Sequence, residues 1–176
     1  MKYFEQLKVK LQRNNFTVCI IGIGYVGVAI LNKLLLKKIK IIAIDKNIKK
    51  LKKIKKNKKV FFTKNYKYIK DADIIIICLP TPLKDNKTPD LSYIKSAIVS
   101  MKKFLRKGQM ISLESTTYPG STEELFIPIL KKKKFNLSKD FFLVYSPERI
   151  SPELKVKDKS IKYNISNTPK LCAGYS

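Results

Sequence analysis

The sequence predicts an α/β fold, in which a doubly wound parallel sheet is followed by an irregular C-terminal tail. Three observations lead to this prediction. Short apolar runs alternate with segments of helical periodicity along the 176 residues. Residues 18–21 and 74–77 are continuous apolar runs, as in parallel strands covered on both faces. A glycine-rich turn, residues 22–27 (G-I-G-Y-V-G), follows the first run directly.

The individual elements follow from the same alternation. A short amphipathic helix is expected around Phe4, Leu7 and Leu11, before a strand at 17–21 and a helix at 25–37. The next elements expected are a strand that ends at Asp45, a lysine-covered helix at 46–59, a weak strand near 60–63 and a strand at 73–79. A helix then starts with Asp90 as its N-cap and stops near Gly108. The last elements expected are a strand at 109–113, a helix at 120–130 and a strand at 141–144. The predicted division is a helical lead-in at 1–15, a Rossmann-like nucleotide-binding domain at 16–150, and an extended or disordered tail at 151–176.

The glycines of the turn suit a phosphate-binding loop. Gly22 allows a tight turn off the strand, Gly24 lets the backbone approach a pyrophosphate, and Gly27 lets the helix lie close to the sheet. The first helical turn, at Tyr25 and Val26, offers unpaired N–H groups and a positive dipole end to phosphates. The alternative interpretation is a strand-to-helix turn with no ligand.

Asp45 closes the next apolar run and can accept hydrogen bonds from both ribose hydroxyls of an adenosine. Together with the glycine turn, it predicts a dinucleotide site. Its charge favours NAD over NADP, although the adjacent Lys46 weakens that argument.

Polar residues also follow the later strands, where ligands of an open parallel sheet bind. Thr81 lies after the strand at 73–79, on the side expected for nicotinamide. Residues 114–117, which include Thr116, follow the next strand, and Glu148 and Arg149 follow the last one. A carboxylate such as Glu148 could orient a water molecule or relay a proton. Each cluster alone could be an ordinary loop, but three at equivalent strand ends favour a site.

The formal net charge of +25 raises nucleic acid as a ligand, but the composition argues against specific recognition. Only Arg13, Arg106 and Arg149 are arginines, and lysine reads bases poorly. In residues 46–59, apolar residues recur every three positions, so the lysines are interpreted as a solvated helix face. Residues 61–68 interleave aromatics with lysines and could stack bases, although an edge strand and a loop is the favoured interpretation.

The chain has three cysteines and no histidine, which argues against a metal site. Cys19 and Cys78 lie within apolar runs and are expected to be buried thiols. No apolar run is long enough to span a membrane and no signal-peptide core occurs at the N-terminus, so a cytoplasmic location is expected.

Four segments in order resemble the UDP-glucose/GDP-mannose dehydrogenase family, most closely the branch acting on UDP-N-acetyl sugars. They are residues 22–27 (G-I-G-Y-V-G), 78–83 (C-L-P-T-P-L), 114–122 (E-S-T-T-Y-P-G-S-T) and 145–149 (Y-S-P-E-R). The resemblance implies oxidation of the C6 alcohol of a UDP-sugar to a carboxylate with two NAD⁺, through a thioester on a cysteine of the second half of the enzyme. It also implies a place in polysaccharide biosynthesis.

Carried over by motif, the cofactor residues are Gly22, Gly24, Tyr25, Val26, Gly27, Asp45, Thr81 and Thr116. The resemblance further implies a catalytic role for Thr116 and Glu148, and substrate contacts for Glu148 and Arg149.

Two departures from the family pattern stand out. Glu153 replaces the usual glycine after Pro152, and the chain stops at Ser176, before the linking helix and second domain that supply the nucleophile and the main dimer contact. Cys172 lacks the glycine-rich surroundings of that nucleophile. We therefore expect a truncated or split enzyme, inactive alone, whose missing half could be a separate chain and whose dimerisation is open. The alternatives are a non-catalytic NAD(H)-binding module and a basic nucleic-acid-binding protein.

Overall fold

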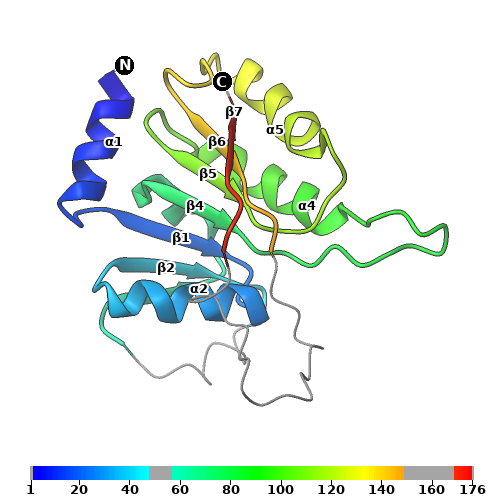
Figure 1. Cartoon of the computed structure of the whole chain (residues 1–176), viewed down its shortest axis with the longest axis horizontal. Helices are drawn as coiled ribbons and strands as arrows, with labels where there is room; N and C mark the ends of the chain where they lie inside the picture. The colour runs from blue at the N-terminus through cyan, green and yellow to red at the C-terminus, as the bar shows by residue number, and fades with distance from the viewer. Residues whose placement is uncertain (1, 48–56, 149–168, 176) are drawn as a thin grey trace.

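A twisted seven-stranded sheet forms the centre of the protein, with the strand order β3-β2-β1-β4-β5-β6-β7 (Figure 1). The computed structural model describes residues 2–47, 57–148 and 169–175. The strands are β1 (Thr17–Ile21), β2 (Lys40–Ile44), β3 (Val60–Thr63), β4 (Ile74–Ile77), β5 (Met110–Leu113), β6 (Phe142–Tyr145) and β7 (Ala173–Tyr175). All neighbouring strands pair in parallel except β6 and β7, which are antiparallel. The order of the first six strands is that of a Rossmann fold, which confirms the predicted fold class.

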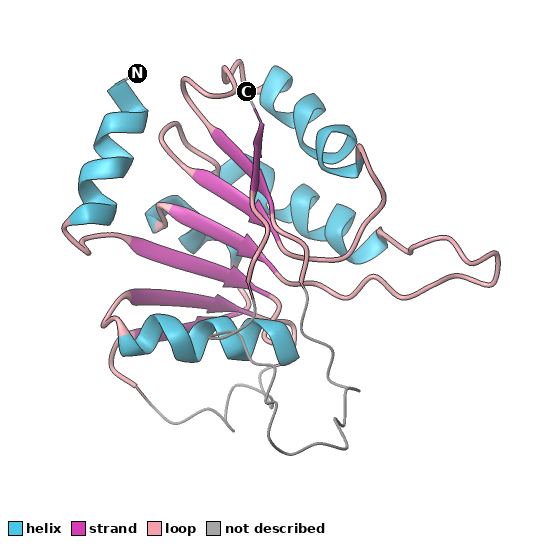
Figure 2. Ribbon diagram, in the orientation of Figure 1, coloured by secondary structure: helices cyan, strands magenta, loops and turns pink. Residues whose placement is uncertain are grey.

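Helices cover both faces of this sheet (Figure 2). They are α1 (Lys2–Gln12), α2 (Tyr25–Leu36), α4 (Ser92–Met101) and α5 (Ser121–Lys132), with 3₁₀ helices η1 (Tyr66–Asp71) and η2 (Lys102–Phe104). None of the helices in the described part of the chain is both long and apolar enough to span a bilayer.

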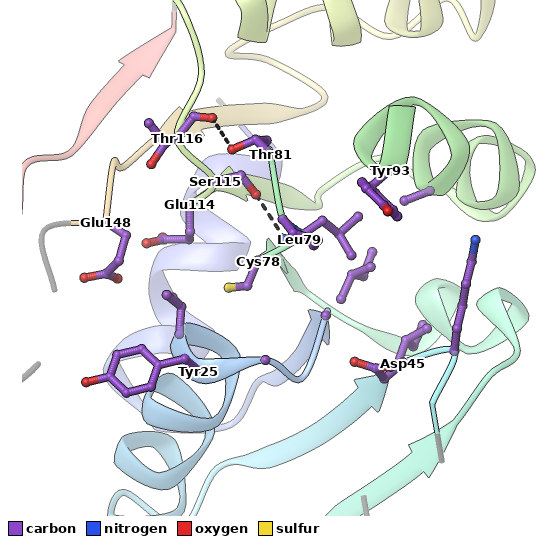
Figure 3. Close-up of a pocket in the computed structure, with 18 of the residues that line it drawn as sticks. Tyr25, Asp45, Cys78, Leu79, Thr81, Tyr93, Glu114, Ser115, Thr116 and Glu148 are labelled. Atoms are coloured by element: carbon purple, nitrogen blue, oxygen red, sulfur yellow. Dashed lines mark hydrogen bonds between the residues drawn. The ribbon is translucent and has the colours of Figure 1, made fainter. Parts of the chain in front are cut away.

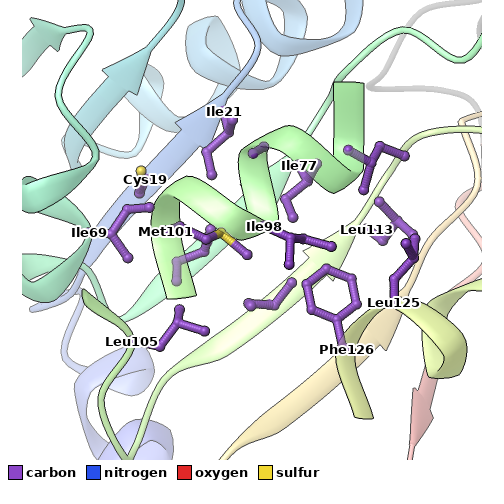
Figure 4. Close-up of a cluster of buried hydrophobic side chains, with 14 of the residues drawn as sticks. Cys19, Ile21, Ile69, Ile77, Ile98, Met101, Leu105, Leu113, Leu125 and Phe126 are labelled. Carbon is purple, nitrogen blue, oxygen red and sulfur yellow. The ribbon is translucent and has the colours of Figure 1, made fainter. Parts of the chain in front are cut away.

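The buried side chains form two clusters, one on each face of the sheet. One contains Leu7 of α1, Ile30 and Leu31 of α2, and the sheet residues that face them. The other lies under α4 and α5 and includes Met101 and Phe126 (Figure 4). Residues 18–21 of β1 alternate between the clusters, which explains why this run is apolar throughout.

Most predicted elements are present, with differences mainly at helix ends. The N-cap of α4 is Leu91 rather than Asp90, although the Asp90 carboxylate accepts a hydrogen bond from the Ser92 amide at 2.9 Å. This helix ends at Met101, well before Gly108, and continues only as η2. Gly108 has a left-handed φ of 80°, but it lies in the turn before β5 and does not end the helix.

The sequence makes predictions for two basic segments, residues 46–59 and 61–68. Residues 48–56 of the predicted lysine-covered helix lie outside the described residues. Residues 61–68 form the edge strand β3 followed by η1, and the rings of Phe61 and Tyr68 pack edge to face with centroids 4.6 Å apart. These rings contact each other, which favours the edge-strand interpretation over a base-stacking surface.

The last described residues of the chain form a strand at the edge of the sheet. Residues 151–168 of the predicted tail lie outside the described residues. Ala173–Tyr175 form β7, which the sequence analysis did not predict, and pair with β6. This pairing brings Lys170 and Cys172 beside the carboxyl end of β6, where the Ser146 hydroxyl donates to the Leu171 carbonyl at 2.7 Å.

Candidate functional site

A cavity of about 480 Å³ opens at the carboxyl ends of the parallel strands. It is lined by the residues that follow β1, β2, β4, β5 and β6. The sheet order reverses between β1 and β4, because the chain winds outward to β2 and β3 on one side and to β5 and β6 on the other. The cavity therefore lies at the topological switch point, where ligands of open α/β sheets bind.

Gly22 and Gly27 make the turn between β1 and α2 possible. Gly22 has φ of 93°, and a Cβ atom there would collide with the carbonyl oxygen of Cys78 at the end of β4. A Cβ atom on Gly27 would collide with the carbonyl oxygen of Gly22. These glycines let α2 start directly against the end of the strand.

Gly24 is different, because its surroundings are open. Among the described residues, no atom beyond its chain neighbours lies within 4 Å of where its Cβ would stand. Gly24 is the N-cap of α2 and lines the cavity with Tyr25 and Val26. The first-turn N–H groups of α2 have no partners within the helix, so the backbone here can receive a phosphate.

Asp45 lies at the end of β2 and lines the same cavity (Figure 3). Its Oδ2 accepts a hydrogen bond from the Ile23 amide at 2.8 Å, and its Oδ1 accepts one from the Asn47 amide at 2.7 Å. The carboxylate is thus held against the glycine turn. Each oxygen has a second lone pair, so Asp45 can still accept hydrogen bonds from a ribose diol.

The loops after β4 and β5 are bound to each other. The Thr81 hydroxyl donates to the Thr116 carbonyl at 2.7 Å, and the Leu79 amide donates to Ser115 Oγ at 3.0 Å (Figure 3). These bonds fix both threonines on the side of the cavity opposite Asp45.

Charged side chains gather beyond these loops. Glu114, at the end of β5, is buried, and its Oε1 accepts a hydrogen bond from Ser112 Oγ at 2.7 Å. The ammonium of Lys170 forms ion pairs with Oε2 of Glu114 and, at 3.1 Å, with Oε2 of Glu148. Burial opposes the charge of Lys170, but the hydrogen bonds and charges of the two glutamates prevail and raise its pKa.

Most of the predicted site residues meet in this cavity. Those that line it are Gly22, Gly24, Tyr25, Val26, Asp45, Thr81, Thr116 and Glu148. Gly27 contributes by packing against Gly22 and is not part of the lining, and Arg149 lies outside the described residues. Cys19 is fully buried as expected, whereas Cys78 is only partly buried and lines the cavity.

Glu114 belongs to the predicted cluster 114–117, and its carboxylate lines the cavity, although no separate role was assigned to it. Two further residues were not predicted: Tyr93 of α4 lines the cavity, and Lys170 pairs with the two carboxylates. Nothing local to Lys170 marks it, because its role depends on the pairing of β7 with β6.

Comparison with known proteins agrees with this geometry. The profile described as "UDP-glucose/GDP-mannose dehydrogenase family, NAD binding domain" matches residues 52–165. The chain belongs to this family. Its structure resembles that of the UDP-N-acetyl-mannosamine dehydrogenase Cap5O from Staphylococcus aureus, with a TM-score of 0.68 and 25% sequence identity over 77% of this chain and 37% of that one.

Two curated relatives extend the likeness beyond the profile match. The UDP-N-acetyl-D-glucosamine 6-dehydrogenase of Pseudomonas aeruginosa is 32% identical over 89% of this chain and 39% of its own length. Protein CapL of Staphylococcus aureus is 36% identical over 81% of this chain and 37% of its own length. The chain thus resembles NAD-dependent UDP-sugar 6-dehydrogenases and spans less than half of each relative.

The residues present fit NAD, the cofactor of the matched domain. Gly24 leaves its backbone open to the cavity, and the uncapped start of α2 offers N–H donors for a pyrophosphate. The Asp45 carboxylate on one side of the cavity could accept hydrogen bonds from an adenosine ribose, and the opposite side, with Thr81 and Thr116, is open to a nicotinamide ring.

Proposed function

We propose that this chain holds the cofactor for the NAD-dependent oxidation of the C6 alcohol of a UDP-N-acetyl sugar to a carboxylate, a step in polysaccharide biosynthesis. The observation that supports this most is a single cavity that joins the glycine turn, Asp45, Thr81, Thr116 and Glu148 at the switch point of the sheet. The UDP-N-acetyl sugar follows from the names of the relatives.

Each residue has a separate part in this proposal. Gly24 and the start of α2 bind the pyrophosphate, and Asp45 holds the adenosine ribose and disfavours a 2′-phosphate. Thr81 and Thr116 enclose the nicotinamide side, and Thr116 positions water near the reacting carbon. NAD⁺, when bound, supplies the hydride acceptor. Glu148 lies at the far end of the cavity, where it can hold or move a proton near the sugar.

We further propose that the 176-residue chain does not complete the oxidation by itself. The relatives are more than twice as long, and none of the described side chains in the cavity supplies an activated nucleophile for a thioester. Burial raises the pKa of the Cys78 thiol, as do the charges of Glu114 and Glu148, so Cys78 is a poor nucleophile at neutral pH. The remaining groups would then come from outside these 176 residues.

The test is NADH formation, followed at 340 nm, with UDP-N-acetyl-glucosamine and NAD⁺. We expect no turnover by this chain alone. We expect turnover by a chimera that joins it to the second part of the Pseudomonas aeruginosa relative, and its loss on Glu148→Gln in that chimera.

Turnover by the chain alone would contradict the need for a second part. A folded chimera that binds NADH, measured by the cofactor's fluorescence, yet oxidises no UDP-sugar would contradict the proposed reaction. It would favour a non-catalytic NAD(H)-binding module.

A further inference from the structure

The ion pairs of Lys170 lie at the end of the cavity opposite Asp45. Glu114 and Glu148 line the cavity there, whereas Lys170 reaches their carboxylates from the segment that leads into β7. Only 6% of the Glu114 side chain and 11% of the Glu148 side chain are exposed. Their charges are therefore poorly screened by water.

The Cys78 thiol lies in the same cavity as these carboxylates. Cys78 follows β4 and lines the cavity beside Leu79 and Thr81. Burial raises its pKa, the charges of Glu114 and Glu148 raise it further, and the charge of Lys170 lowers it. All three charged groups thus act on the part of the cavity assigned to nicotinamide.

Among the described residues, this cluster places two carboxylates and one ammonium beside this part of the cavity. The oxidised nicotinamide ring is a cation, and the reduced ring is neutral. A negative field at the ring stabilises the bound oxidised form and has little effect on the reduced form. The number of charges in the cluster therefore affects which redox state is held more tightly.

We propose that the Glu114–Lys170–Glu148 cluster determines how strongly the site discriminates between NAD⁺ and NADH. Lys170 is the positioning residue of this cluster: it holds the two carboxylates together and offsets one of their charges. The inference rests on the proposed cofactor site, because it requires nicotinamide on the Thr81 and Thr116 side. It adds that the segment before β7 takes part in cofactor selection and in release of the reduced product.

The test compares the dissociation constants of NAD⁺ and NADH for each variant at low ionic strength, by calorimetry. Lys170→Met removes one positive charge next to both carboxylates, so we expect the ratio Kd(NADH)/Kd(NAD⁺) to rise about three- to tenfold. Glu148→Gln removes a negative charge, so the ratio is expected to fall by a similar factor. Lys170→Arg keeps the charge and is expected to keep the ratio within about twofold.

Lys139→Met is the matched control, because it removes the same charge at an exposed position in the loop before β6, away from the cavity. Its ratio should equal that of the unmodified chain. Thermal unfolding of each variant verifies that it is folded. If Lys170 only supported the fold, its replacement would weaken both cofactors alike and leave the ratio unchanged.

The failures of the two proposals are distinguishable. If both cofactors bind and neither Lys170→Met nor Glu148→Gln moves the ratio, the charge cluster does not select the redox state and this inference is wrong. If neither cofactor binds to the unmodified chain, the proposed cofactor site is wrong and the inference is overturned with it.

Discussion

Gly22→Ala is expected to lower the free energy of unfolding by about 2–5 kcal/mol. Two costs add at this position. An alanine at φ of 93° is in the left-handed region, which costs roughly 1–2 kcal/mol, and its Cβ would collide with the Cys78 carbonyl, an overpacking cost of about 1–3 kcal/mol. Because the collision is with backbone, the end of β4 must move away from β1. Urea unfolding at neutral pH measures the difference.

Gly24→Ala is the control for this prediction. Gly24 has φ of −87°, which any residue adopts, and its Cβ would enter open space. We expect the free energy of unfolding of Gly24→Ala to differ from that of the unmodified chain by less than about 1 kcal/mol. The added methyl group should instead obstruct a bound phosphate. Equal stability of Gly22→Ala and the unmodified chain would show that the turn is not built as described.

Asp73→Asn is expected to lower the free energy of unfolding at neutral pH by about 2–4 kcal/mol. Asp73 is buried, and its carboxylate accepts from Lys10 Nζ at 2.7 Å and Arg106 Nη2 at 3.0 Å. It also accepts from the Thr17 amide at 3.1 Å, so it joins α1, β1 and the segment before β5. An asparagine keeps part of this hydrogen bonding and leaves both cations unpaired. The exposed Asp85→Asn, with the same change of charge, should have almost no effect.

The pH dependence of this difference has a defined sign. Burial opposes ionisation of Asp73, but the hydrogen bonds from Lys10, Thr17 and Arg106 outweigh it and lower its pKa. The stabilisation is therefore complete above the unfolded value of about 3.9 and is lost as the pH falls through the lower folded value. The gap between Asp73→Asn and the unmodified chain should narrow below about pH 4. A gap that stays constant down to pH 2 would contradict this account.

Much of the fold could be predicted because its signals are local. Residues 18–21 of β1 and the strand β4 are covered on both faces, so these two runs had to be apolar, and the glycine turn marks the point where β1 gives way to α2. The C-terminal limit of α4 was harder to predict. Its apolar face continues through Phe104 and Leu105, which pack against the core although the helix has already ended at Met101.

The residues of the candidate site also differ in how far the sequence predicts them. Asp45, Thr81 and Glu148 lie at strand ends, and parallel strands bring their ends to one edge, so sequence order was enough to place them together. Lys170 and β7 could not be predicted like this. The antiparallel pairing of a three-residue strand with no alternating pattern depends on tertiary contacts with β6, and only those contacts bring the ammonium to Glu114 and Glu148.

The most direct test of the central claim, that the glycine turn and Asp45 bind NAD, is calorimetric titration of the chain with NAD⁺ and NADP⁺. We expect binding of NAD⁺ in preference to NADP⁺, and a loss of NAD⁺ affinity of about tenfold or more on Asp45→Asn, because a hydrogen bond to a charged group contributes about 1.5–3 kcal/mol. The same substitution should narrow the preference over NADP⁺, since the repulsion of a 2′-phosphate is gone. No heat with millimolar NAD⁺, or the same affinity after Asp45→Asn, would contradict the account.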